Sequence, residues 1–199
     1  SSIILIPITL FFIIKGSFLF IFFILSCLFV AIYEWHTLSK KKSYRIFGFI
    51  FLFLSFYTIY KLRIDLNEYW FLLLVIICVS TDIGGYVFGK IFKGPKLTKF
   101  SPNKTYAGMI GGYLLSVLSA ITYANYYFSE EITIKWFIFI ISISTISQLG
   151  DIIISYFKRL SKIKDTGKII PGHGGLLDRI DGMIFAFPFS YLIIIIDIL

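Results

Sequence analysis

The sequence predicts an all-α fold, a polytopic integral membrane protein built as a helical bundle of about seven spans. Of its 199 residues, 58% are hydrophobic and only 15% are charged, whereas about a quarter of a typical soluble domain is charged. The mean hydropathy is +0.88. The apolar residues fall into runs long enough for helices to cross a hydrocarbon core about 30 Å thick. This composition excludes disordered, fibrous and ordinary soluble globular proteins.

Seven apolar runs define the expected helices. They cover residues 1–14, 17–38, 46–60, 69–89, 106–128, 135–157 and 178–199. The first run is short or truncated, because the chain starts inside it without Met, which indicates a missing N-terminal piece. Gly16 is typical of a tight turn before the second run, and Tyr57 and Tyr60 can anchor the short third run at the membrane interface. We interpret 1–68 as N-terminal membrane helices and 69–199 as C-terminal helices that carry the site, within one integrated membrane domain.

Alternate loops differ in charge, which predicts the orientation of the bundle. The loops after the second, fourth and sixth runs hold most of the chain's 19 Lys and Arg residues. These are Lys40, Lys41, Lys42, Arg45, Lys90, Lys93, Lys96, Lys99, Lys104, Lys158, Arg159, Lys162, Lys164 and Lys168. Because cytoplasmic loops are enriched in Lys and Arg, we expect this face to be cytoplasmic. We expect the protein to lie in a bacterial inner membrane and to have no nucleic-acid partner.

Carboxylates interrupt the apolar runs. They are Glu34, Asp82, Asp151 and Asp197. A charge within a span is costly, so it indicates a functional site with a partner. Glu34 and Asp197 lie near expected helix ends, where a carboxylate costs little, and a structural role for Glu34 stays open. Asp151 shares one helix face with Gln148 and Ser155, which favours a polar stripe toward the cytoplasmic loop, although a polar contact between helices is the alternative.

Two further acids begin the last run. Asp178 and Asp181 are spaced i, i+3, so both face one side of a helix. If they meet Asp151, the carboxylates form an oxygen-rich site suited to Mg²⁺. The sequence contains no cluster of Cys and His, so we do not expect a site for a soft metal.

The loop between Asp151 and Asp178 is dense in groups that bind phosphate. It contains Lys158, Arg159, Lys164, Asp165, Pro171, Gly172, His173, Gly174 and Gly175. Lys and Arg supply positive charge, and glycine lets backbone N–H groups approach phosphate oxygens. Beside acidic metal ligands, these groups indicate phosphoryl or nucleotidyl transfer. The alternative is a basic loop that only anchors the protein at the cytoplasmic face.

A second polar stretch joins the fourth and fifth runs. Gly84 to Ile91 nearly matches a P-loop, but Ile91 stands at its Ser/Thr position and no strand precedes it, so we reject that interpretation. Glycines here and at the start of the fifth run favour close helix packing. Lys104 and Thr105 precede a helix, where they could present a cation, a hydroxyl and N–H groups to a phosphate. The alternative for Thr105 is a simple N-cap.

The chain resembles the phosphatidate cytidylyltransferase (CDP-diacylglycerol synthase) family. Its similarity to that family's C-terminal signature lies in Ser155 to Arg159, Lys164-Asp165 and His173 to Asp181, with support from Gln148 to Asp151, Ser101 to Thr105 and Tyr33 to Trp35. The resemblance covers nearly all of the chain, although the first third matches mainly in hydropathy. Ala107 stands where many members have Glu, so no role of that acid carries over.

The resemblance implies an enzyme that converts CTP and phosphatidic acid into CDP-diacylglycerol and pyrophosphate with Mg²⁺. It implies Asp151 and Asp178 as metal ligands, joined by Asp181. The catalytic residues would be Asp151, Asp178, Lys164, Asp165, His173 and Arg179, and the substrate-binding residues Ser101, Lys104, Thr105, Ser155, Lys158, Arg159, Gly174, Gly175 and Asp82. His173 would donate to a phosphate or shape the glycine turn, with proton transfer as the alternative. A homodimer is expected, and a second cation stays open.

Other classes of protein compete with this interpretation. A transporter also has intramembrane acids and helices broken by glycine, but it leaves the Lys, Gly, His and Asp loop without a role. A related enzyme would use another lipid acceptor, as a polyprenol kinase or an archaeal-type ether-lipid cytidylyltransferase does. A scaffold without chemistry has no need of clustered acids.

Overall fold

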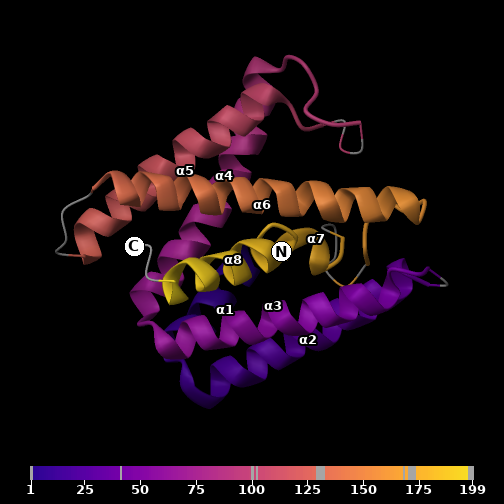
Figure 1. Cartoon of the computed structure of the whole chain (residues 1–199), viewed down its shortest axis with the longest axis horizontal. Helices are drawn as coiled ribbons and strands as arrows, with labels where there is room; N and C mark the ends of the chain where they lie inside the picture. Colours follow the sequence, from indigo (N-terminus) through magenta and orange to yellow (C-terminus); the bar gives the residue numbers. More distant parts are fainter. Residues whose placement is uncertain are drawn as a thin grey trace.

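The computed structural model of the chain describes residues 2–40, 42–99, 101, 103–128, 133–167, 169 and 174–196. Its helices are α1 (Ser2–Lys15), α2 (Ser17–Leu38), α3 (Arg45–Asp65), α4 (Glu68–Phe92), α5 (Tyr106–Tyr127), α6 (Ile134–Leu160), α7 (Leu177–Ile180) and α8 (Met183–Ile195). Figure 1 shows α7 and α8 between α6 on one side and α2 and α3 on the other. Within the described ranges no strand forms, and Lys96 and Thr105 make an isolated bridge.

Five of these helices, α2 to α6, are long and apolar enough to cross a membrane. The two other apolar helices are shorter, with 14 residues in α1 and 13 in α8. The predicted all-α membrane fold is therefore confirmed, and the chain is an integral membrane protein. Whether the short helices bring the number of spans to seven stays a prediction.

Helix α3 runs farther than the sequence predicts. The expected helix covered 46–60, but α3 continues to Asp65. Lys61 Nζ and Asp65 Oδ1 are 3.0 Å apart on its last turn, and Arg63 Nε donates to the carbonyl oxygen of Ile13 at 2.9 Å. Lys61, Arg63 and Asp65 thus lie on the helix, although they follow the apolar run 46–60, because long charged side chains can reach polar partners from the end of a span.

The last predicted run, 178–199, is divided in the structure. Helix α7 takes Leu177–Ile180, and α8 begins only at Met183. Gly182, at the break, packs closely on α6, because a Cβ there would lie 2.8 Å from the carbonyl oxygen of Ser147. The acids expected at the start of a span therefore lie on and just after a short separate helix.

Helices α4 and α5 approach closely through their glycines. A Cβ on Gly108 would lie 2.6 Å from the carbonyl oxygen of Gly85, and one on Gly112 would lie 3.0 Å from that of Thr81. Any larger side chain would push the two backbones apart. The prediction of close helix packing at these glycines is confirmed.

Two buried apolar clusters join the N-terminal and C-terminal helices. In the first, Phe20 of α2 packs on Phe71 of α4, with ring centroids 5.7 Å apart. The second surrounds the start of α7 and includes Trp35, Leu177 and Ile184. This second cluster holds α7 against α2 and α6, beside the polar loop that follows α6.

Candidate active site

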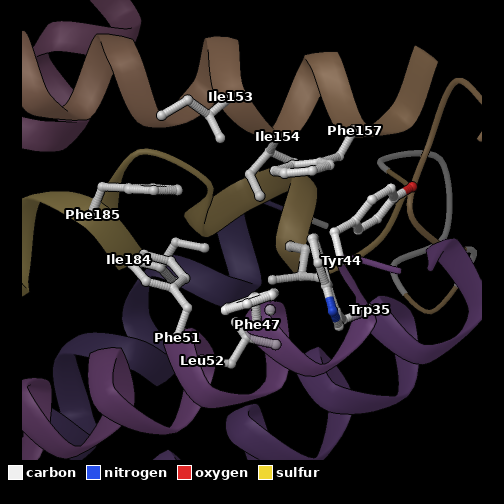
Figure 2. A pocket seen from close by; sticks show the side chains of 12 residues that line it. Trp35, Tyr44, Phe47, Phe51, Leu52, Ile153, Ile154, Phe157, Ile184 and Phe185 are labelled. Carbon is white, nitrogen blue, oxygen red and sulfur yellow. The ribbon is translucent and has the colours of Figure 1, made fainter. Parts of the chain in front are cut away.

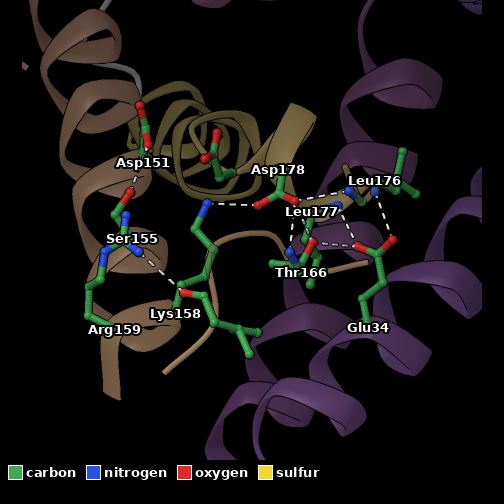
Figure 3. A network of polar contacts seen from close by, with 12 residues as sticks. Glu34, Asp151, Ser155, Lys158, Arg159, Thr166, Leu176, Leu177 and Asp178 are labelled. Atoms are coloured by element: carbon green, nitrogen blue, oxygen red, sulfur yellow. Dashed lines mark hydrogen bonds and ion pairs between the residues drawn. The ribbon is translucent and has the colours of Figure 1, made fainter. Parts of the chain in front are cut away.

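Asp178, on α7, is the centre of a polar network that ties the loop after α6 to that helix (Figure 3). Lys158 Nζ lies 2.7 Å from its Oδ1. Its Oδ2 accepts hydrogen bonds from the backbone N–H of Thr166 at 2.8 Å and of Gly175 at 2.9 Å. Burial acts to raise the pKa of Asp178, but the hydrogen bonds from Lys158, Gly175 and Thr166 outweigh it, so the pKa lies below its ordinary value. Both oxygens of this carboxylate have protein partners.

Glu34, on α2, holds the same loop from the other side. Its side chain is 1% exposed. The backbone N–H groups of Leu176 and Leu177 each donate to it at 2.8 Å, and Thr166 Oγ1 lies 2.9 Å from its Oε2. A Cβ on Gly167 would lie 2.7 Å from its Oε1, so the loop needs glycine there. The structural role left open for Glu34 is the one observed.

Thr166 connects these two carboxylates. Its Oγ1 lies 2.9 Å from Glu34 and 3.1 Å from Asp178 Oδ2, and its side chain is buried. A hydroxyl has one proton to donate, so the two acids share a single O–H donor. Neither Thr166 nor Glu34 was among the predicted site residues. Two signals in the sequence pointed to Glu34: a carboxylate at the end of an apolar run, and the similarity of Tyr33 to Trp35 to the family.

Asp151, on α6, binds a different loop. It forms an ion pair with Lys104, which precedes α5, and it accepts a hydrogen bond from Ser155 Oγ at 3.3 Å. Gln148 Nε2, on the same face, lies 3.5 Å from the carbonyl oxygen of Met109. The polar stripe expected on this helix thus makes contacts with its neighbours along its length.

Asp181, in the turn between α7 and α8, lies close to other acids. Its side chain is buried, with 7% exposed, and its carboxylate accepts the N–H of Gly182 at 2.9 Å. Burial raises the pKa of Asp181 well above its ordinary value, and the negative charges of Asp151 and Asp82 raise it further, against the opposing charges of Lys158 and Lys104. The carboxylates of Asp82 on α4 and Asp151 on α6 therefore lie near enough to Asp181 to affect its pKa.

We name Asp82, Asp151 and Asp181 the acidic cluster. Among the residues that the structure describes, no three His, Cys, Asp or Glu side chains are placed to hold a metal ion. The cluster instead brings together acids close enough to repel one another, with Lys104 and Lys158 beside them. The predicted roles of Asp151, Asp178 and Asp181 as metal ligands stay predictions.

The remaining predicted residues lie around these groups. Thr105 Oγ1 accepts the N–H of Gly108 at 3.1 Å, so it makes the N-cap that was its simpler interpretation. The N–H of Ser101 donates to Thr98 Oγ1 at 3.1 Å. Arg159 Nη1 donates to the carbonyl oxygen of Ile163 at 3.4 Å.

Gly174 adopts a left-handed conformation with φ of 84°, and a Cβ there would lie 2.8 Å from Asp178 Oδ2 and 3.4 Å from Asp165 Cβ. Only glycine fits here, because a positive φ is strained for other residues and because there is no space for a Cβ. Lys164 and Asp165 lie in the same loop. Arg179 lies on α7 beside Asp178. His173 lies outside the described residues.

The chain is similar to known proteins over most of its length. The family model of the Cytidylyltransferase family matches residues 49–197. A phosphatidate cytidylyltransferase of Rickettsia felis is 36% identical over 176 residues, which cover 82% of this chain and 76% of the relative. One of Rickettsia bellii is 37% identical over 173 residues, with 80% and 73% covered, and one of Staphylococcus saprophyticus is 33% identical over 168 residues, with 80% and 64% covered. These matches confirm the resemblance that the sequence predicts.

Proposed function

The chain belongs to the cytidylyltransferase family, and from this premise we propose that it transfers the cytidylyl group of CTP to phosphatidic acid. The products are CDP-diacylglycerol and pyrophosphate. The observation that carries the proposal is that a basic, glycine-containing loop and several acids meet at one place in a membrane bundle. Lys158 pairs with Asp178, and the backbone of Asp181 packs on Gly150, the residue before Asp151. The relatives are named for the same transfer.

In this reaction an oxygen of the lipid phosphate attacks the α-phosphorus of CTP. A new P–O bond forms, the bond between the α- and β-phosphates breaks, and pyrophosphate leaves with its electron pair. The lipid phosphate is already ionised near neutral pH, so the reaction needs no strong general base. Catalysis then depends on positioning and on neutralising negative charge. Lys104, Lys158, Lys164, Arg159 and Arg179 are the cations of the site that would hold phosphate oxygens.

We propose that Mg²⁺ binds at this site through Asp151, Asp178 and Asp181, with Asp82 nearby. Binding would require these side chains to rearrange, because the described conformation does not place three of them to hold a metal ion. Carboxylate oxygens are the donors that Mg²⁺ prefers, and a divalent cation would offset the mutual repulsion that Asp151 and Asp82 exert on Asp181. When bound, the ion would neutralise charge on the phosphates. In the described conformation Lys158 occupies Oδ1 of Asp178, so ligation by that atom requires Lys158 to turn toward a phosphate oxygen.

The proposed site lies at the end of the bundle that carries the Lys- and Arg-rich loops. Loops rich in Lys and Arg follow α2, α4 and α6, and the polar network lies where α6 enters its loop. By the positive-inside rule this end faces the cytoplasm, where CTP is available, and the membrane would be a bacterial inner membrane. A homodimer stays an expectation.

A direct assay tests the proposed function. Purified protein in detergent would receive CTP, phosphatidic acid and Mg²⁺, with CDP-lipid and pyrophosphate as the readouts. We expect activity that EDTA abolishes and that Asp151→Asn or Asp178→Asn lowers by at least about a hundredfold, the order expected for lost transition-state electrostatics. Asp65→Asn is the control, because its side chain is 40% exposed and its contacts are an ion pair with Lys61 on the same helix and a hydrogen bond from Tyr191.

The outcomes separate the competing functions. Full activity in both site variants would contradict the metal assignment. If the protein modified a polyprenol or an ether lipid and gave no product from phosphatidic acid, the proposed lipid acceptor would be wrong. The proposed active site would still stand. No product from any lipid acceptor would overturn the proposed function.

A further inference from the structure

An apolar cavity of about 180 Å³ lies beside the polar network, among α2, α3, α6, α7 and α8 (Figure 2). Two of its lining residues carry polar atoms, and both atoms are engaged elsewhere. Trp35 Nε1 donates to the carbonyl oxygen of Arg45 at 3.0 Å, and Tyr44 OH lies 3.1 Å from Ser161 Oγ. The cavity therefore presents carbon surface to an occupant.

The cavity and the polar network share two short pieces of chain. Phe157 lines the cavity, and the next residue, Lys158, reaches Asp178. Leu177 also lines the cavity, and the next residue is Asp178 itself. A molecule with an anionic end at Lys158 could thus extend an apolar part into the cavity.

The cavity also reaches the outside of the bundle. Phe47 of α3 and Ile153 of α6 belong to its lining, and they are 76% and 37% exposed. In a membrane-spanning bundle, exposed apolar side chains of spanning helices face the acyl chains of the bilayer. Tyr44 and the end of α2 place the cavity next to the Lys-rich loop that follows α2, on the same side as the network. A lipid in that leaflet could enter between α3 and α6.

We propose that this cavity holds part of an acyl chain of the phosphatidic acid substrate, while the phosphate lies at Lys158. This inference rests on the proposed function. An apolar cavity of about 150 Å³ takes up a benzene ring, so a cavity of this volume accommodates a segment of several methylenes. The carbon lining matches the chain, and the adjacent lysine matches the charge of the headgroup.

The first test uses Trp35 as a reporter. The two other tryptophans, Trp70 and Trp136, stack on each other with ring centroids 5.3 Å apart and do not line the cavity. The double variant Trp70→Phe, Trp136→Phe leaves Trp35 as the single tryptophan, which can be excited selectively over the tyrosines. In nanodiscs without CTP, we expect phosphatidic acid with brominated acyl chains to quench Trp35 at least about twice as strongly as brominated phosphatidylcholine at the same mole fraction. Equal quenching by the two lipids would overturn the proposal.

The second test keeps all tryptophans and narrows the cavity. With Ile153→Phe, we expect the KM for long-chain phosphatidic acid to rise about fivefold or more and the preference to move toward shorter chains, while the KM for CTP stays unchanged. Ile138→Phe is the matched control, because Ile138 lies on the same helix, is 60% exposed and does not line the cavity. An unchanged chain-length profile in Ile153→Phe would contradict an acyl chain in the cavity.

The two tests also separate this inference from the function on which it rests. Formation of CDP-lipid without selective quenching and without a shifted chain-length profile would remove the cavity proposal and keep the proposed function. Selective quenching without any CDP-lipid would keep a cavity that binds phosphatidic acid and overturn the transfer reaction.

Discussion

Asp178 and Asp181 belong to the same short segment, yet they lie in opposite environments. Asp178 receives Lys158 and N–H groups of the loop, and its pKa lies below the ordinary value despite burial. Burial and the charges of Asp151 and Asp82 raise the pKa of Asp181 well above the ordinary value. The segment therefore has two sides. On the loop side, Lys158 and backbone N–H groups stabilise the charge of Asp178. On the acidic side, Asp181 is buried near the carboxylates of Asp151 and Asp82.

The largest effects are expected when Asp178 and Asp181 are each replaced by Asn. We expect Asp178→Asn and Asp181→Asn each to lower kcat/KM by about a hundredfold. Their effects on stability should differ. Asp178→Asn keeps an acceptor oxygen for Lys158 but removes the negative charge of a buried ion pair, and it should cost about 3 kcal/mol. Asp181→Asn removes a buried acid near two others and should leave the melting temperature equal or higher. Thermal unfolding in detergent with EDTA measures this. An equal loss of stability in both variants would contradict the division into two sides.

A smaller effect is expected for Glu34→Gln. The variant keeps one acceptor oxygen but turns an amide donor toward the N–H groups of Leu176 or Leu177. Since hydrogen bonds to a charged group contribute about 1.5–3 kcal/mol, we expect a loss of about 2 kcal/mol, with kcat/KM lower by roughly tenfold. Glu68→Gln is the control, because Glu68 is 41% exposed and its pair with Arg63 is 3.7 Å long. Should Glu34→Gln behave like Glu68→Gln, Glu34 would not organise the loop.

Thr166 gives a finer test of the loop side. Thr166→Val keeps the shape of the side chain but removes the hydroxyl shared by Glu34 and Asp178. We expect a loss of about 1–3 kcal/mol, because two buried acceptors lose their common donor. Thr166→Ser restores a hydroxyl and should recover most of the melting temperature and activity. Failure of Ser to do better than Val would show that the methyl packing, and not the hydroxyl, matters here.

The smallest expected effect is the pH dependence of stability without metal. Because the folded pKa of Asp178 is lowered, its contribution is complete above the ordinary value of 3.8 and is lost as the pH falls through the lower folded pKa. Asp181 has the opposite sign, since a raised folded pKa means that protonation on lowering the pH from neutral stabilises the fold. We expect the melting temperature in EDTA to rise slightly between about pH 7 and 5 and to fall below about pH 4. Asp181→Asn should remove the rise, and Asp178→Asn should reduce the fall.

The sequence predicts the helices well because membrane spans are set by length and hydropathy alone. The run at 17–38 coincides with α2, and the runs at 106–128 and 135–157 match α5 and α6 to within a few residues. The predicted helix boundaries are wrong where contacts of individual side chains, and not the hydropathy of the run, set where a helix ends. Helix α3 continues through polar residues to Asp65. The last apolar run is broken at Gly182, which packs closely on α6, and the hydropathy of the run does not indicate this break.

The sequence predicted most residues of the candidate site, but it did not predict which acid pairs with which cation. The motif residues near the end of the chain indicated acids, cations and glycines, and the structure brings Lys158 to Asp178 and Lys104 to Asp151. Which acid pairs with which cation depends on how helices distant in sequence pack. The contact of Glu34 with Leu176 and Leu177 is of this kind, because it joins the second helix to a segment near the other end of the chain.

The contact of Glu34 with Leu176 and Leu177 limits how far the chain can be shortened without loss of the site. The family match begins at residue 49, beyond Glu34. A fragment trimmed to the matched region would leave the amides of Leu176 and Leu177 without their acceptor in a water-poor setting. Helix α2 is thus part of the site, although the family match begins after it, and an engineered minimal version has to retain it.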